Sequence, residues 1–203
     1  MKTRKQIKEA NKKFFNLWAK TYDWGISKFW LYSLQKKAVS YLKLKNNLKI
    51  LDVGCGTGDS LVLLNRLNPN IDLYGLDISE EMLKKARKKL NEKGVLKLGD
   101  VENTSFKSNF FDFVITTEAF HHFPNPDLAL KEIYRVLKKN GKLVLTDITF
   151  KSKLIKRLFK FLEPGHVKIY TGKEFEELLT KNKFKLIKQE KIGLFVILTM
   201  GQK

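Results

Sequence analysis

A glycine-rich turn constrains the fold of this chain more than any other feature of its sequence. Residues 49–53 (KILDV) have the apolar pattern of a buried strand, and a helical pattern starts at Asp59. Between them, Gly54, Gly56 and Gly58 stand at alternate positions. Glycine is needed where the backbone takes a positive φ or where a ligand lies directly on it. A tight loop without a ligand is the plain alternative, but the strand–turn–helix context is the one that a nucleotide site requires.

Apolar runs alternate with amphipathic segments after this turn, and the alternation predicts the fold class. The expected strands cover residues 49–53, 71–76, 95–98, 111–116 and 142–146, and the expected helices cover residues 59–67, 79–94, 127–138 and 172–181. Repeated strand–helix–strand units predict an α/β fold, with a Rossmann-like, mostly parallel sheet and helices on both faces. Two further strand-like runs, 184–192 and 194–200, are separated only by Gly193. They must form an antiparallel hairpin, because parallel neighbours need a long crossover.

Two segments lie outside this alternation and divide the chain into an N-terminal part, residues 1–45, and a main domain, residues 46–203. Residues 1–45 read as helical and hold all three tryptophans, and residues 150–165 place apolar side chains at helical spacing between lysines. Either segment could pack as an ordinary helix on the sheet edge. The alternative hypothesis is that residues 1–45 and an insertion within 150–170 form a lid over a substrate pocket, and that the lysines touch an anionic membrane surface.

Charge and cysteine content limit the partners and the compartment. The 203 residues carry 40 basic and 21 acidic side chains, a formal net charge of +19, but the basic residues are nearly all lysines spread along the chain. This distribution favours a solvated lysine coat over a nucleic-acid-binding face. Cys55 is the only cysteine, and no apolar segment follows the basic N-terminus. We therefore expect no internal disulfide, no signal peptide and a cytoplasmic protein.

Acidic residues at the predicted strand ends indicate which ligand the turn binds. The dinucleotide fingerprint G-x-G-x-x-G would place its third glycine at position 59, where Asp59 would repel a pyrophosphate. Asp52 ends the strand below the turn, so the two acids suit a cofactor that carries positive charge. Asp77 ends the second strand about 20 residues beyond the turn, where an acid accepts ribose hydroxyls. Asp100, after the third strand, could accept a hydrogen bond from an adenine amine.

These residues belong to a set of motifs by which the chain resembles class I S-adenosylmethionine-dependent methyltransferases, close to the group with the quinone-biosynthesis C-methyltransferases. The resemblance covers roughly residues 14–150. Its motifs are Trp18-Ala19-x-x-Tyr22-Asp23, the turn at 51–58, Leu76-Asp77-Ile78-Ser79, Gly99-Asp100, Phe111-Asp112, His121-His122-Phe123-Pro124-Asn125-Pro126 and Leu137-Lys138-Lys139-Asn140-Gly141. The resemblance implies S-adenosylmethionine as cofactor and a seven-stranded sheet with an antiparallel last strand.

The resemblance also implies a role for each residue of the predicted cofactor site. Residues of the glycine turn would approach the methionine part of the cofactor, and an acid with its neighbour would bind the ribose. The next acid and its neighbour would bind the adenine, and the main chain of a threonine would bind the methionine amine. In that order the expected cofactor residues are Asp52, Gly54, Cys55, Gly56 and Gly58, then Asp77 and Ile78, then Asp100 and Val101, then Thr116 or Thr117, with Tyr22 closing over the cofactor.

One difference from related enzymes limits the class of methyl acceptor. Thr116-Thr117-Glu118-Ala119 stands after the fourth strand in place of the Asp/Asn-Pro-Pro-Tyr motif with which methyltransferases act on adenine or glutamine amines. We therefore expect a small, apolar or aromatic methyl acceptor. An RNA or protein methyltransferase, motivated by the net charge, and a non-catalytic cofactor-binding module are the alternatives.

Catalysis by such an enzyme depends mainly on alignment of the acceptor and exclusion of water. His121 and His122 follow the fourth strand, near the expected mouth of the site, where a histidine could accept a proton near neutral pH. The alternative is that both histidines only orient the loop. We expect no metal site, because His166 is the only other histidine and Cys55 lacks ligand spacing. The sequence indicates no oligomeric state.

Overall fold

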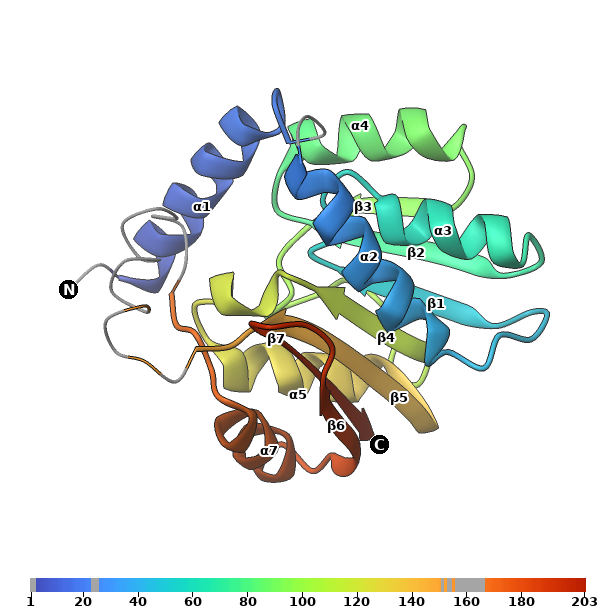
Figure 1. The fold of residues 1–203 in the computed structure, drawn as a ribbon. Helices are drawn as coiled ribbons and strands as arrows, with labels where there is room; N and C mark the ends of the chain where they lie inside the picture. Colours follow the sequence, from blue (N-terminus) through green and yellow to red (C-terminus); the bar gives the residue numbers. More distant parts are fainter. Residues whose placement is uncertain (1–2, 23–25, 151, 153–154, 156–166) are drawn as a thin grey trace.

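The computed structural model describes residues 3–22, 26–150, 152, 155 and 167–203, and a seven-stranded sheet forms its centre (Figure 1). The strands are β1 (Lys49–Val53), β2 (Asp72–Asp77), β3 (Val95–Leu98), β4 (Phe111–Thr117), β5 (Leu137–Ile148), β6 (Lys185–Lys191) and β7 (Val196–Gln202). The helices are α1 (Arg4–Trp18), α2 (Ile26–Ser40), α3 (Asp59–Leu67), α4 (Glu80–Leu90), the short 3₁₀ helix η1 (Phe120–His122), α5 (Pro126–Val136) and α7 (Gly172–Lys181).

The sheet has the order β3-β2-β1-β4-β5-β7-β6. Strands β3, β2, β1, β4 and β5 pair in parallel, and β7 runs antiparallel to both of its neighbours, β5 and β6. This topology confirms the predicted mostly parallel sheet and the antiparallel hairpin at its end. The order reverses at β1 and β4, so the carboxyl ends of these two strands lie at the switch point where open α/β sheets bind ligands.

Strand β5 is longer than predicted, because the Asn140-Gly141 turn is a bulge within the strand. Leu137 already pairs with Phe111, whereas the next pair joins Lys142 to Phe113. Asn140 lies between these pairs with φ 63°. Asparagine tolerates this left-handed conformation better than most residues, so the extra residues fit without ending the strand.

Helices cover both faces of the sheet, as predicted, because neighbouring strand residues point to opposite sides. Ile50 packs with buried residues of α2, α3 and α4 on one face. Leu51 packs with buried residues of α5 and of α7 on the other face. Helix α4 begins after Ser79, the first residue of the predicted helix, and the Ser79 hydroxyl accepts a hydrogen bond from the Met82 amide. The predicted end of this helix at residue 94 was wrong, because the helix ends at Leu90 and Asn91, at φ 49°, is its C-cap.

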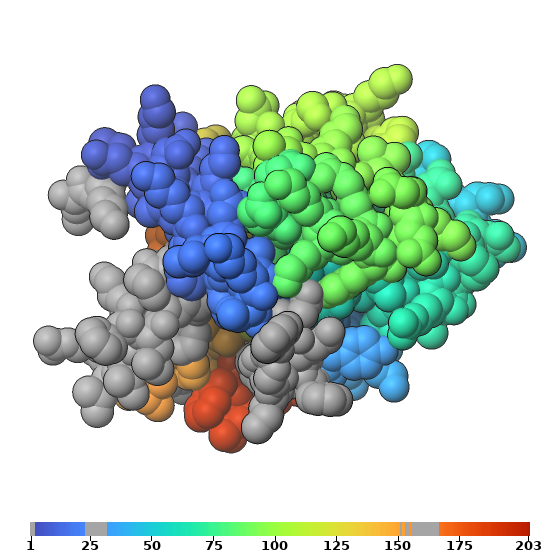
Figure 2. Space-filling model, turned by 90° about the horizontal axis from the view of Figure 1, so that it is seen from above, coloured from blue at the N-terminus to red at the C-terminus, as the bar shows by residue number. Residues whose placement is uncertain are grey.

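The predicted helical segment 1–45 forms two helices with different positions. Helix α2 buries Ala38 and Val39 in the core and covers the sheet as an ordinary helix. Helix α1 lies beyond the carboxyl ends of the strands, and Figure 2 shows it beside α4 on this side of the molecule. Most of the apolar, lysine-rich stretch 150–165 lies outside the described residues, so its predicted lid helix stays a prediction. Within the described ranges, no helix is long and apolar enough to span a membrane.

Candidate functional site

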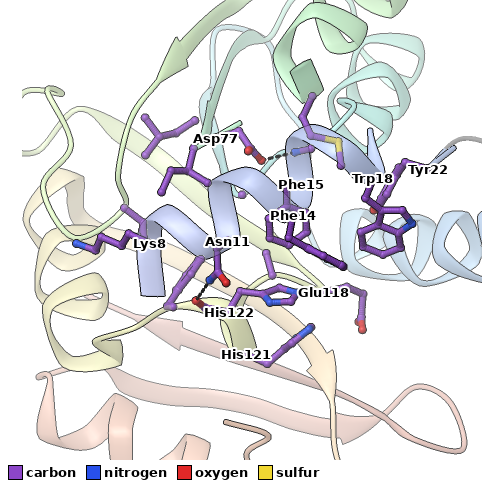
Figure 3. Close-up of a pocket in the computed structure, with 18 of the residues that line it drawn as sticks. Lys8, Asn11, Phe14, Phe15, Trp18, Tyr22, Asp77, Glu118, His121 and His122 are labelled. Carbon is purple, nitrogen blue, oxygen red and sulfur yellow. Dashed lines mark hydrogen bonds between the residues drawn. The ribbon is translucent and has the colours of Figure 1, made fainter. Parts of the chain in front are cut away.

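A cavity of about 800 Å³ lies between the carboxyl ends of the parallel strands and helix α1 (Figure 3). Its floor comes from the loops that follow β1, β2, β3 and β4, and its cover is the inner face of α1. The volume lies within the range of about 300–1,000 Å³ that is typical of small-molecule sites. The cavity therefore lies at the edge of the sheet where the fold and the predicted site residues both indicate a ligand site.

The three glycines of the turn have different structural reasons. All three take positive φ, between 51° and 80°. A Cβ atom at Gly54 would lie 2.6 Å from the Cβ of Ala119, and one at Gly58 would lie 3.0 Å from the Cβ of Ala86. A Cβ at Gly56 would meet nothing within 4 Å, and Gly56 lines the cavity. Gly54 and Gly58 thus permit close packing, whereas Gly56 leaves bare backbone open to a ligand.

Asp77 connects the turn after β1 with the turn after β2. Its Oδ2 accepts a hydrogen bond of 2.8 Å from the Gly56 amide, and its Oδ1 accepts one of 2.8 Å from the Ser79 amide. Burial raises the pKa of Asp77, and these backbone donors oppose the rise. Since each carboxylate oxygen has more than one lone pair, Asp77 keeps accepting capacity toward the cavity that it lines.

Asp52 lies beneath the turn and does not line the cavity. Its side chain is buried, and Oδ1 has no hydrogen-bond partner among the described residues. Burial, together with the negative charge of Asp77, raises the pKa of Asp52 to about 8. Asp77 and Asp52, both predicted as cofactor contacts, therefore occupy different positions: Asp77 lies at the wall of the cavity, and Asp52 lies below it.

The predicted adenine contact, Asp100, lines the cavity but already has a cationic partner from α1. The ammonium group of Lys8 forms ion pairs with the carboxylates of Asp100 and Glu102, the latter at 2.5 Å. The Glu102 amide also donates to Asp100 Oδ1 over 2.9 Å. Val101, the predicted neighbour in this contact, is buried and lines the cavity. Lys8 could not be recognised from the sequence, because one lysine among many in a basic helix gives no signal.

Polar side chains of α1 attach this helix to the loops of the sheet. The buried amide of Asn11 donates to the carbonyl oxygen of His122 at 3.0 Å (Figure 3). The Ser79 hydroxyl donates to Asn16 Oδ1 at 2.6 Å. Asn11 is 5% exposed and is the buried position of α1. An asparagine on the inner face of an amphipathic helix was the sequence signal that could have revealed this attachment.

Aromatic rings of α1 form one wall of the cavity. The ring centroids of Phe14 and Trp18 lie 5.4 Å apart, and those of Trp18 and Tyr22 lie 4.9 Å apart. Phe15 meets the ring of His122 edge-on, with centroids 4.8 Å apart. These four aromatic side chains, three from α1 and Tyr22 from its C-terminal extension (residues 19–22), all line the cavity. Trp24 lies outside the described residues, and of Trp30 the structure describes only the backbone, within α2.

The segment after β4 brings both predicted histidines to the cavity. His121 and His122 line it, with ring centroids 4.0 Å apart. Glu118 also lines it and has φ 53°, a left-handed conformation that is uncommon for a non-glycine residue. The Glu118 amide donates to the Thr146 carbonyl of β5 over 2.9 Å, which extends the pairing of β4 with β5 beyond Thr117.

Most residues of the predicted site lie around one cavity. Those that line it are Tyr22, Gly54, Gly56, Asp77, Ile78, Asp100, Val101, Thr117, His121 and His122. Those that do not line it are Asp52, Cys55, Gly58 and Thr116. Among the residues that the structure describes, no cluster of histidine, cysteine or acidic side chains could hold a metal ion.

Comparison with known proteins assigns the family. The model of a methyltransferase domain matches residues 44–191, which include the glycine turn, Asp77 and the segment after β4. The chain belongs to this methyltransferase domain family. The match confirms the predicted class I S-adenosylmethionine-dependent methyltransferase, and with it S-adenosylmethionine as the cofactor.

Curated relatives are similar to the chain over part of their length. A demethylmenaquinone methyltransferase of Thermotoga maritima is 33% identical over 139 residues, which are 68% of this chain and 54% of that protein. One of Anoxybacillus flavithermus is 32% identical over 154 residues, 70% of this chain and 64% of that protein. The chain thus spans between about half and two thirds of the length of these relatives.

Solved structures share the fold. A chain of the complex between the Haloferax volcanii Trm112 methyltransferase activator and a putative methyltransferase superimposes with a TM-score of 0.82 at 21% identity, covering 93% of this chain and 96% of that one. An S-adenosylmethionine-dependent methyltransferase of Thermotoga maritima, described as a possible histamine N-methyltransferase, gives a TM-score of 0.73 at 24% identity, covering 93% and 98%. At this identity the likeness confirms the Rossmann-like fold.

Proposed function

We propose that this chain transfers the methyl group of S-adenosylmethionine to a small aromatic acceptor of the quinone class. The observation that carries the proposal is the aromatic wall of α1, which lines the same cavity as Gly56 and Asp77. Aromatic side chains bind planar apolar rings by stacking and edge contacts. The relatives named demethylmenaquinone methyltransferases support a quinone-like acceptor.

The residues that line the cavity indicate how each part of the cofactor is held. Bound S-adenosylmethionine supplies an electrophilic methyl group on a positively charged sulfur. The bare backbone at Gly56 offers room for its methionine part, and the Asp77 carboxylate offers an acceptor for the ribose hydroxyls. Asp100 and Val101 line the region that we assign to adenine. Asp100 would bind the adenine while it stays in its ion pair with Lys8.

Helix α1 serves in this proposal as the cover of the site and as the wall for the acceptor. The contacts of Lys8, Asn11 and Asn16 hold it against the loops after β3, β4 and β2, respectively. A cover of this kind excludes water from the methyl transfer and strengthens local electrostatic interactions. The N-terminal lid that we predicted for residues 1–45 thereby reduces to α1 and its C-terminal extension, since α2 belongs to the core.

Labelled methyl transfer tests the proposal against its alternatives. The protein is incubated anaerobically with methyl-labelled S-adenosylmethionine and with reduced demethylmenaquinone, total RNA or a protein extract in separate reactions. We expect label in the quinone alone. Label in RNA or protein would replace the quinone by a macromolecular acceptor, and cofactor binding without transfer to any fraction would favour a non-catalytic module.

A weak contact with an anionic membrane surface is a second part of the proposal, because quinones of this class are lipophilic. On α1, Leu17 lines the cavity and is nevertheless 69% exposed, with the exposed Lys13 and Lys20 nearby in sequence. Lysines near an anionic leaflet contribute about 1 kcal/mol each. We expect co-flotation with phosphatidylglycerol vesicles at low salt but not with phosphatidylcholine vesicles. Equal flotation with both lipids, or none, would remove the membrane contact.

A further inference from the structure

The first histidine after β4 forms a buried pair with an aspartate of β5. Nδ1 of His121 lies 2.5 Å from Oδ1 of Asp147. The main-chain amide of His121 donates to the other carboxylate oxygen, Oδ2, at 2.8 Å. The side chains of His121 and Asp147 are 3% and 0% exposed. One carboxylate therefore fixes both the backbone and the ring of the same histidine.

Asp147 is itself held in a fixed orientation. It pairs with Ile197 of β7 inside the antiparallel ladder, and its Oδ1 accepts a further hydrogen bond of 2.7 Å from the Ile148 amide. A carboxylate oxygen only accepts hydrogen bonds, so the hydrogen between the two side chains belongs to Nδ1 of the histidine. The neutral ring is then the tautomer whose Nε2 carries a lone pair. His121 lines the cavity, and Nε2 is the ring nitrogen that does not face Asp147.

The second histidine is held by contacts of a different kind. The carbonyl oxygen of His122 accepts from Asn11, and its ring packs edge-on against Phe15 at 4.8 Å. Both contacts attach helix α1 to the loop. These contacts assign His122 to the docking of the cover, whereas the carboxylate of Asp147 directs the ring of His121.

We infer that His121 is the general base of the reaction and that Asp147 is its positioning residue. The inference rests on the proposed function, because it requires an acceptor that loses a proton on methylation. In the transfer, the acceptor forms a bond to the methyl carbon, the bond between that carbon and sulfur breaks, and its electron pair stays on sulfur. The acceptor proton passes to Nε2 of His121 and later to water. The Asp147 carboxylate stabilises the imidazolium that forms.

Nitrogen NMR tests the tautomer without any acceptor. In the wild-type protein at a pH where the ring is neutral, long-range ¹⁵N–¹H spectra should show His121 protonated at Nδ1. In Asp147→Asn, the new amide group should donate to Nδ1 and leave the proton on Nε2. A wild-type ring protonated at Nε2 would overturn the inference whatever the acceptor is. Asp127→Asn, at a surface aspartate that bonds Lys181 and Asn182, is the matched control and should leave the His121 signals unchanged.

Kinetics with the acceptor identified by labelled transfer provide the second test. His121→Ala and Asp147→Asn should lower kcat by about 10²–10⁴-fold, with KM for the acceptor and the calorimetric cofactor Kd changed less than about threefold. Added imidazole should restore part of the rate of His121→Ala and should not affect His122→Ala. Wild-type rates in His121→Ala would overturn the base, and loss without imidazole rescue would overturn it as well. If the wild-type protein methylates no quinol, the proposed function fails, and the tautomer result alone decides the pairing.

Discussion

The side-chain amide of Asn11 donates its hydrogen bond to the carbonyl oxygen of His122, which lies 111 residues further along the chain. The bond joins the middle of α1 to the loop that carries both histidines, and Asn11 is buried. The docking of the cover thus depends on a polar group that is removed from water and satisfied by main chain. A polar pair of this kind defines one position of α1, since any slide of the helix would break it.

Asn11→Ala tests this attachment. The substitution leaves the buried His122 carbonyl without its donor, which costs about 1–3 kcal/mol. Because α1 lies outside the sheet, we expect this cost to appear as opening of the helix. Relative to the wild type, amide hydrogen exchange should be faster in α1 and unchanged in β1. Lys13→Ala, on the exposed side of the same helix, is the control. Unchanged exchange in α1 of the Asn11 variant would contradict the role of this bond.

Substitution by alanine should have different effects at Gly54 and at Gly56. Gly56→Ala places its methyl group in open space of the cavity at φ 51°, so it should cost only the strain of the left-handed backbone, about 1 kcal/mol. It should nevertheless weaken cofactor binding at least tenfold in calorimetry. Gly54→Ala meets the Cβ of Ala119 at 2.6 Å, and its main effect should be a lower melting temperature. Equal cofactor affinity in Gly56→Ala and the wild type would place the cofactor elsewhere.

Asp77→Asn should weaken cofactor binding more than it weakens folding. The substitution removes a charged acceptor for ribose hydroxyls, and hydrogen bonds to charged groups contribute about 1.5–3 kcal/mol each. It also turns an NH₂ group toward the amide of Gly56 or Ser79, which disturbs the turn. We expect at least a tenfold rise in Kd for S-adenosylmethionine and for its demethylated product. Asp72→Asn, at the exposed beginning of β2, should leave Kd unchanged.

Asp52 should make the stability of the cofactor-free protein depend on pH. Its pKa rises from 3.8 to about 8 on folding, so between these values the folded chain holds a proton that the unfolded chain has lost. The contribution of Asp52 to the free energy of unfolding is fully present at pH values below its unfolded pKa of 3.8. It falls by about 1.4 kcal/mol per pH unit as the pH rises toward about 8. Asp52→Asn lacks this titration, so urea unfolding should give it a stability advantage that grows from pH 4 to pH 8. A difference that stays constant with pH would show that Asp52 is ionised in the fold.

The sequence predicted those parts of the molecule that depend on neighbouring residues. Helix α3 begins at Asp59 and ends at Leu67 as expected, because a left-handed glycine precedes it and an extended asparagine follows. The start of α4 was also correct, since Ser79 caps it within one turn. The loops at the strand ends reached one cavity because parallel strands bring their carboxyl ends together.

Contacts between distant segments could not be predicted in this way. Lys8 reaches Asp100 only after α1 docks, and Asp147 meets His121 only because β5 lies beside β4. No local pattern marks an aspartate near the end of an apolar strand as the partner of a histidine in another loop. The division of residues 1–45 into a core helix and a cover likewise depends on α3 and the sheet, which follow later in the chain.

The position of β7 has a consequence for how the protein is made. This strand is the last in sequence, yet it lies between β5 and β6 in the sheet. During synthesis, β5 therefore keeps an unpaired edge until β7 has left the ribosome, even though β1 to β5 can already assemble. Exposed strand edges of this kind pair readily with other chains. A nascent chain that stalls before residue 196 should thus be a ready client for chaperones, whereas one whose residues 196–202 have left the ribosome should no longer need them.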